Sequence, residues 1–153
     1  RLLFVCMGNI CRSPAAEGVM NKLLRDEGLD ELTLIDSAGT ISFHSGSPAD
    51  PRMKESARKR GIELESRARQ VKPEDFEKFD LILTMDGNNY RDVRNMAKSE
   101  TDQQKVKKFT DYCMEHTHQE VPDPYYGAHD GFEEVLDLLE DGCKHLLETL
   151  LKR

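Results

Sequence analysis

The sequence Cys6-Met7-Gly8-Asn9-Ile10-Cys11-Arg12-Ser13 lies between a predicted strand and a predicted helix. Residues 2–5, Leu-Leu-Phe-Val, form the short apolar run that is typical of a buried parallel strand. Ser13-Pro14 opens the helix, because proline suits the first helical turn and apolar residues then recur at helical spacing. The loop therefore precedes a helix N-terminus, where unpaired amides and the helix dipole favour an anion.

The residue types in this loop predict thiolate chemistry on a phosphate group. The field at the helix N-terminus favours the thiolate form of Cys6, which is a nucleophile. Gly8 and Asn9 tolerate positive φ, so the loop can curl its amides around a tetrahedral oxyanion. Arg12 can bind two phosphoryl oxygens at once, and Ser13 can donate a hydrogen bond to the sulfur. The other loop residues expected in the binding site are Met7, Ile10 and Cys11.

Two simpler interpretations of the cysteines compete with this one. A lone cysteine is usually a small buried apolar residue, and a Cys and an Arg six positions apart recur by chance. The whole string, with a strand before it and a helix after it, makes the phosphate interpretation the better one. The spacing of Cys6 and Cys11 does not match a zinc site, and no second pair follows. We therefore expect no metal and no cofactor.

The string from Phe4 to Pro14 resembles the signature of the low-molecular-weight protein tyrosine phosphatases. Residues 36–40, 68–70 and 121–127 resemble further segments of that family, so the likeness runs through nearly the whole chain. The resemblance implies hydrolysis of phosphotyrosine in proteins, or of small aryl phosphates, through a phosphocysteine intermediate, with inorganic phosphate as product. It implies that Cys6 is the nucleophile, Arg12 the phosphate clamp and Asp123 the general acid. It also implies that Ser37 hydrogen-bonds Asn9 and so supports the phosphate loop.

Asp123 fits the acid role on chemical grounds as well. Cleavage of a phosphate ester by a thiolate must protonate the departing oxygen and then activate a water, and one carboxyl group can do both. Prolines 122 and 124 restrict the backbone on either side, although a simple turn aspartate is the alternative. Tyr125, more than Tyr126, is expected to pack against an aryl ring. Phe43 and His44 are further candidates for the substrate cleft.

Composition indicates one compact domain, residues 1–153, in a reducing cytoplasm. The four cysteines show no disulfide framework, and no apolar run is long enough to span a membrane. The net charge is −7, yet residues 52–72 hold eight Lys or Arg against three Glu. That run is most simply a solvated helix face. An acidic chain without a nucleic-acid motif is not expected to bind nucleic acid or a membrane.

Hydrophobic patterning alternates between strands and helices. Strands are predicted at residues 2–5, 32–36 and 80–85, with a weaker fourth at 107–109. Helices are predicted at residues 15–27, 48–60, 88–97 and 131–151. This order predicts an α/β fold, a single-domain open parallel sheet of about four strands with helices on both faces. The phosphate loop follows the first strand, at the edge of the sheet where such folds bind ligands.

Three other functions are less consistent with the sequence. Arsenate reductases on the same scaffold need further redox cysteines, and residues 85–90 contain none. Phosphoarginine phosphatases place a threonine where this chain has Ile10 and lack the tyrosine pair at 125–126. A non-catalytic phosphotyrosine-binding or redox-sensing module would not need Cys6, Arg12 and Asp123 together. One departure from the family pattern is Ser66-Arg67, where many relatives carry a histidine that supports the loop asparagine.

Overall fold

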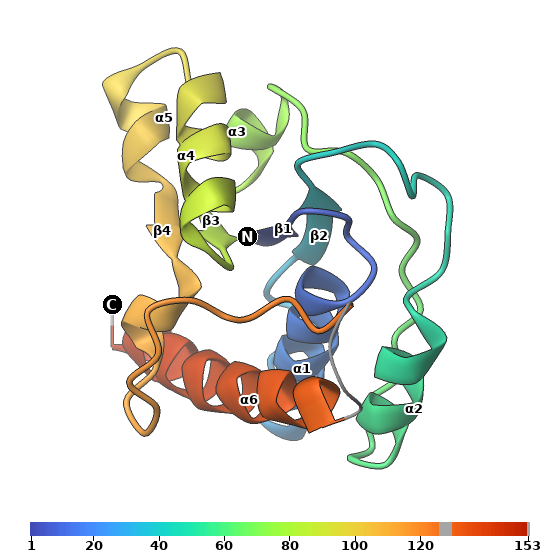
Figure 1. The fold of residues 1–153 in the computed structure, drawn as a ribbon. Helices are drawn as coiled ribbons and strands as arrows, with labels where there is room; N and C mark the ends of the chain where they lie inside the picture. Colours follow the sequence, from blue (N-terminus) through green and yellow to red (C-terminus); the bar gives the residue numbers. More distant parts are fainter. Residues whose placement is uncertain (126–129, 153) are drawn as a thin grey trace.

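The computed structural model describes residues 1–125 and 130–152, and Tyr126 lies outside them. Figure 1 shows the order of the elements. The strands are β1 (Leu2–Cys6), β2 (Ile35–Gly39), β3 (Leu81–Thr84) and β4 (Val106–Lys108). The helices are α1 (Arg12–Asp26), α2 (Pro51–Arg58), α3 (Asp75–Lys78), α4 (Gly87–Met96), α5 (Glu100–Gln104), the 3₁₀ turn η1 (Phe109–Tyr112) and α6 (Asp130–Leu151).

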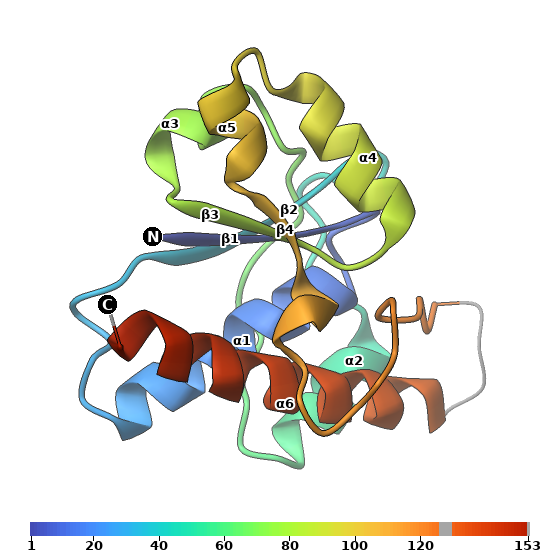
Figure 2. The same cartoon turned by 90° about the vertical axis from the view of Figure 1, so that its left-hand side faces the viewer.

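The four strands form one parallel sheet in the order β2-β1-β3-β4. Figure 2 shows the sheet nearly edge-on, with α1, α2 and α6 on one face and α3, α4 and α5 on the other. Side chains of β1 alternate between these layers: Phe4 packs in the core under α1 and α6, whereas Leu3 and Val5 pack in the core on the opposite face. The predicted α/β fold is confirmed.

The predicted bounds of β2 are wrong. The sequence favoured residues 32–36, but the strand is Ile35–Gly39, and Leu32 is 79% exposed. Pairing with β1 sets the register, from Leu2 opposite Ile35 to Cys6 opposite Gly39. Pairing with β1, a central strand of the sheet, thus draws Ser37, Ala38 and Gly39 into β2, although these residue types have little preference for strands.

Smaller differences affect the other elements. Helix α2 starts at Pro51 instead of residue 48, because Asp50 caps it by accepting a hydrogen bond from the amide of Arg52 at 2.8 Å. Strand β4 lies one residue before the predicted 107–109. Helices α3 and α5 and the turn η1 were not predicted, since elements of four or five residues show no periodicity.

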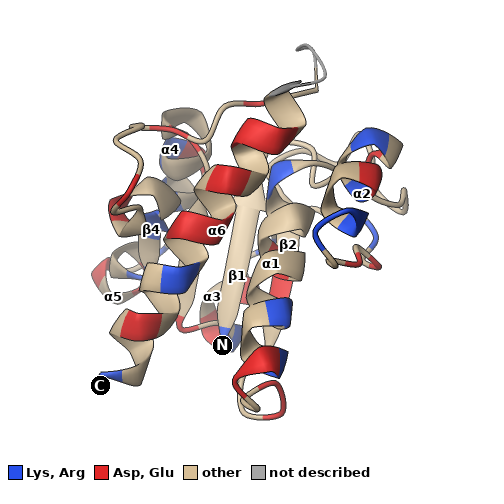
Figure 3. Ribbon diagram, turned by 90° about the horizontal axis from the view of Figure 1, so that it is seen from below, with Lys and Arg blue, Asp and Glu red and all other residues tan. Residues whose placement is uncertain are grey.

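Charged side chains tie the layer of α2 and α6 together. Figure 3 shows acidic residues along α6 and basic residues around α2 and the segment that follows it. Arg60, just after α2, forms ion pairs with three carboxylates of α6, at 2.8 to 3.2 Å: Glu133, Asp137 and Glu140. At least one residue of the basic run at 52–72, Arg60, therefore forms ion pairs within the protein and is not simply part of a solvated helix face. None of the described helices is long and apolar enough to cross a membrane.

A buried carboxylate on α6 holds the segment that follows η1. The side chain of Asp141 accepts hydrogen bonds from the amides of Met114, Glu115 and His116 at 2.9 to 3.0 Å. The ring Nδ1 atoms of His116 and His145 lie 2.8 and 2.9 Å from the same carboxylate. Burial alone would raise the pKa of Asp141, but these donors lower it to about 2.

We expect Asp141 to make unfolding strongly pH-dependent. Because its pKa is lowered by folding, its contribution is complete above its unfolded pKa near 3.8 and is lost as the pH falls toward 2. The shift corresponds to about 2 kcal/mol. Urea unfolding should show that Asp141→Asn loses most of this at pH 7. Glu148→Gln, an exposed site on the same helix, should change little, and equal effects of the two variants would contradict the assignment.

Candidate active site

The loop between β1 and α1 is a tight cradle of backbone amides. Asn9 has φ of +58°, the left-handed conformation that asparagine adopts more readily than most residues. Gly39, at the end of β2, lies against the loop: a Cβ at that position would come within 2.6 Å of the Met7 carbonyl oxygen. The absence of a side chain at residue 39 is therefore what allows the loop to curl so close to the sheet.

Hydrogen bonds around Asn9 fix the direction of the whole supporting network. The amide N–H of Arg69 can only donate, so it must face Oδ1 of Asn9, at 3.0 Å. Nδ2 of Asn9 therefore donates to the hydroxyls of Ser13, at 2.7 Å, and Ser37, at 3.0 Å. Ser37 in turn donates to the carboxylate of Glu17 at 2.6 Å, and burial raises the pKa of this carboxylate.

The network ends at the sulfur of Cys6. Because Ser13 accepts from Asn9, its own proton is available, and Cys6 Sγ at 3.0 Å is closer than its other acceptor, the Ala38 carbonyl at 3.4 Å. The backbone amide of Asn9 also donates to Cys6 Sγ, at 3.3 Å. Both donors stabilise negative charge on the sulfur, as does the N-terminus of α1.

Arg12 lies inside the protein between the loop and two other segments. Its guanidinium, 3% exposed, donates to Asp86 at 2.7 Å and to the Val121 carbonyl at 3.1 Å, and lies 3.4 Å from Asp123. Burial by itself lowers the pKa of Arg12, but Cys6 and the two carboxylates raise it above its ordinary value. A permanent cation is thus fixed beside the sulfur.

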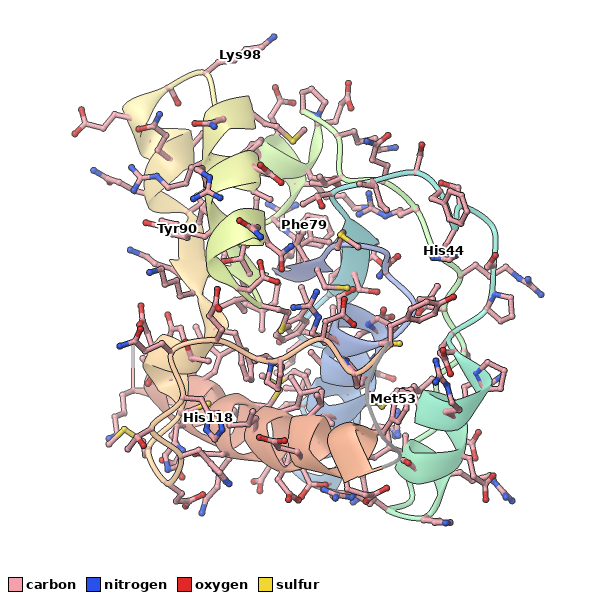
Figure 4. The ribbon with its side chains drawn as sticks, viewed as in Figure 1. His44, Met53, Phe79, Tyr90, Lys98 and His118 are labelled. Carbon is pink, nitrogen blue, oxygen red and sulfur yellow. The ribbon has the colours of Figure 1, made fainter. Side chains whose placement is uncertain are left out.

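These groups line one cavity of about 40 Å³, more than a single water molecule needs. The cavity is narrow, and the cysteine at its base is only 2% exposed. Figure 4 shows His44, one of its wall residues, on the loop between β2 and α2. The lining consists of Cys6, Met7, Gly8, Ile10, Cys11, Arg12, His44, Asp123 and Tyr125.

Three residues expected to bind substrate lie elsewhere. Asn9 and Ser13 are buried behind the cavity, 2% and 0% exposed, where they hold the loop and the sulfur. Phe43 lies outside the cavity lining; it is 83% exposed and its ring packs edge-on against that of His44 at 4.9 Å. Ser37 does hydrogen-bond Asn9, as expected.

The second cysteine of the loop differs from the first in its surroundings. Burial raises the pKa of the Cys11 thiol far above its usual range, and the negative charges of Asp50 and Cys6 raise it further. Cys11 is therefore a neutral thiol at physiological pH. Its place is at the N-cap of α1, where its carbonyl begins the helical hydrogen bonds by accepting from the amide of Ala15.

Two functional contacts were missed from the sequence. Asp86, which directs Arg12, follows β3 closely, and the carboxyl ends of neighbouring parallel strands meet at one edge of the sheet. That topological argument could have found it. Glu17, the acceptor for Ser37, lies on the buried side of α1 and gives no such signal.

The comparisons with known proteins agree with this geometry. The family model described as low molecular weight phosphotyrosine protein phosphatase matches residues 1–153. A Synechocystis protein provisionally named low molecular weight protein-tyrosine-phosphatase is 53% identical, over 99% of this chain and 97% of its own. The human low molecular weight phosphotyrosine protein phosphatase is 39% identical, over 96% and 93% of the two chains.

This chain belongs to the low molecular weight phosphotyrosine protein phosphatase family. Among solved structures, the Entamoeba histolytica protein tyrosine phosphatase superposes with a TM-score of 0.96 at 46% identity, covering 99% of this chain and 96% of its own. A Drosophila arginine phosphatase superposes with a TM-score of 0.91 at 27% identity, covering 98% and 97%. The fold of this phosphatase family is therefore compatible with more than one kind of phosphate substrate.

The structure shows how this family member supports Asn9 without the histidine of many relatives. Oδ1 of Asn9 accepts from a main-chain amide, that of Arg69, which any residue at that position other than proline could supply. The Arg69 guanidinium fixes this segment by binding the carboxylates of Asp36 and Asp75 at 3.0 to 3.3 Å. A side chain at position 66 or 67 is thus not needed for this contact.

Gly39→Ala tests whether the loop depends on its close contact with β2. The added methyl group should displace the loop and weaken binding of inorganic phosphate by at least about tenfold. Gly28→Ala is the control: residue 28 has φ of +70° with open space around it, so alanine costs about 1 kcal/mol of stability away from the site. Calorimetric titration with phosphate should separate the two; equal phosphate affinities would show that the contact is unimportant.

Proposed function

We propose that this protein is a protein tyrosine phosphatase that hydrolyses phosphotyrosine and aryl phosphate monoesters through a phosphocysteine intermediate. The observation that carries the proposal is the convergence of Cys6, Arg12 and Asp123 on one narrow cavity at a helix N-terminus. Membership in the family supports the same activity. The whole chain, residues 1–153, is proposed as one phosphatase domain.

In the first step, the Cys6 thiolate attacks phosphorus. An S–P bond forms as the P–O bond to the leaving group breaks, and Asp123 gives its proton to the departing oxygen. The loop amides and the guanidinium of Arg12 bind the phosphoryl oxygens, whose charge they stabilise in the transition state. Because Asp86 already orients this guanidinium, little reorganisation is needed when the phosphate enters.

In the second step, water replaces the enzyme on phosphorus. Asp123, now ionised, takes a proton from the water, whose oxygen forms the new P–O bond while the S–P bond breaks. Cys6 leaves as a thiolate, which the Ser13 hydroxyl and the Asn9 amide stabilise. Inorganic phosphate is the product, and the balance requires only the ester and one water molecule.

The walls of the cavity favour an aryl ester. Rings of Tyr125 and His44, 6.0 Å apart, stand at the cavity whose base holds the nucleophile. A phosphate on the long, flat side chain of tyrosine can reach this base while its ring contacts the walls. We also propose that the protein works in a reducing cytoplasm, where Cys6 is not oxidised to a disulfide and proteins carrying phosphotyrosine are available.

Replacing the nucleophile should abolish turnover without preventing binding. A serine hydroxyl is a far weaker nucleophile than a cysteine sulfur, so Cys6→Ser should bind inorganic phosphate but hydrolyse no p-nitrophenyl phosphate. Cys113→Ser, a thiol outside the cavity, is the control and should retain activity. Turnover near the wild-type rate in Cys6→Ser would exclude this cysteine as the nucleophile.

The general acid can be tested by varying the leaving group. Asp123→Ala should lower kcat/KM for phenyl phosphate by roughly 10²–10⁴-fold, because phenolate is a poor leaving group without a proton. An ester of a strongly acidic phenol should lose much less. If both esters lost the same factor, or neither lost activity, Asp123 would not protonate the leaving group.

Selectivity among phosphorylated peptides should follow the cavity walls. Peptides with phosphotyrosine should be hydrolysed with higher kcat/KM than matched peptides with phosphoserine or phosphoarginine. Tyr125→Ala should reduce the preference in kcat/KM for phosphotyrosine peptides over the other peptides by the free energy of one aromatic contact, about 0.5–1.5 kcal/mol. Ile10→Thr should favour phosphoarginine if residue 10 also contributes to the choice. A wild-type protein that prefers phosphoarginine would overturn the proposed substrate but leave the cysteine mechanism intact.

A further inference from the structure

Arg52, near the start of α2, links the N-cap residue of this helix, Asp50, to Tyr125 in the cavity lining. Its guanidinium forms a two-point hydrogen bond with Asp50, Nε to Oδ1 at 3.1 Å and an Nη atom to Oδ2 at 2.9 Å. The same Nη atom donates to the backbone carbonyl of Tyr125 at 3.1 Å. Neither the mechanism above nor the family signature in the sequence gives this arginine a role.

Two aromatic rings lie within cation–π distance of this guanidinium. Its central carbon is 5.5 Å from the centre of the Tyr125 ring and 4.8 Å from that of Phe132, in α6. Arg52 therefore links the start of α2 to the segment with the candidate acid and to the first turn of α6. The side chain remains 45% exposed, so these contacts lie at the surface beside the cavity and not in the core of the protein.

Hydrogen bonds continue from this arginine to the phosphate loop and to the candidate acid. On one side, the amide of Asp50 donates to the carbonyl of Ile10 in the phosphate loop, at 2.8 Å. On the other, the amide of Tyr125 donates to Oδ1 of Asp123, at 3.0 Å. A continuous path thus runs from the loop that holds phosphate to the carboxyl group that must reach the leaving oxygen.

We propose that Arg52 is a positioning residue for the general acid, which it holds in register with the phosphate loop through Asp50 and Tyr125. This inference rests on the proposed function and adds a residue that touches neither phosphate nor the reacting atoms. Arginine suits the role because its planar group can form the two-point bond to Asp50 and lie near aromatic rings at once. Lysine can provide only a point charge at this position.

The test compares two substitutions of arginine by methionine on the same helix. Arg52→Met keeps the aliphatic stem but removes the side-chain hydrogen bonds to Asp50 and Tyr125, while the backbone amide of residue 52 still donates to Asp50. Arg58→Met, which removes an exposed pair with Glu55, is the control and should behave like the wild type. We expect Arg52→Met to lower kcat/KM for phenyl phosphate by about tenfold, and to lower that for an ester of a strongly acidic phenol much less. Urea unfolding checks that both variants fold.

A second background makes the test specific for Asp123. If Arg52 acts by positioning this acid, Arg52→Met should cost almost nothing in a protein that already carries Asp123→Ala. Asp50→Asn can still cap α2 but loses the ionic bond to Arg52. It should therefore also lower kcat/KM more for phenyl phosphate than for an ester of a strongly acidic phenol, to a smaller degree than Arg52→Met. This variant replaces Arg52→Met in the test if Arg52→Met does not fold.

The outcomes separate this inference from the proposed function. The role of Arg52 would be overturned if Arg52→Met lowered kcat/KM equally for both esters, or for neither. It would also be overturned if Arg52→Met lowered kcat/KM just as much in a protein that already carries Asp123→Ala. If the wild type showed no turnover that depends on Cys6, the proposed function itself would fail. If Asp123→Ala showed the leaving-group effect while Arg52→Met did not, only the inference would fail.

Discussion

The left-handed conformation of Asn9 is the constraint on which the site depends. It turns the backbone so that the loop amides curl back toward Cys6, and it costs free energy that the surrounding contacts must offset. The side chain of Asn9 makes three hydrogen bonds, with Arg69, Ser13 and Ser37, and the direction of each is fixed. The same bonds that stabilise the strained residue also leave the Ser13 proton for the sulfur, so loop shape and thiolate stabilisation have one origin.

The sheet brings the remaining groups to this point. Strands β1, β2 and β3 run parallel, so their carboxyl ends lie side by side, with the phosphate loop after the first, Gly39 ending the second and Asp86 after the third. Asp123 comes from the segment before α6, which is held by the main-chain bond between Val121 and Met85 and by Arg12 itself. Figure 1 shows this segment passing beside the first turn of α1. The reacting groups thus come from distant parts of the sequence but from one edge of the fold.

The sequence was informative wherever a pattern was local. Residues 2–14 predicted a strand, a loop and a helix, and these are present because their apolar spacing and proline act within a few residues. The site was harder to predict from the sequence where tertiary contacts determine which residues take part. The bounds of β2 follow its pairing with β1, and the roles of Asp86 and Glu17 depend on chain segments 74 and 20 residues away. Phe43 looked like a wall residue from its type alone, whereas His44 beside it lines the cavity.

The central claim is that catalysis passes through a phosphoryl group on Cys6 Sγ. The most direct test is rapid quenching of the wild-type protein into denaturant during turnover of p-nitrophenyl phosphate, followed by phosphorus NMR of the trapped protein. The account predicts a resonance of phosphorus bonded to sulfur, which appears with the first burst of p-nitrophenol and is missing from Cys6→Ser. A burst accompanied by phosphorus bonded to oxygen or nitrogen of the protein, or by no phosphoprotein at all, would contradict it.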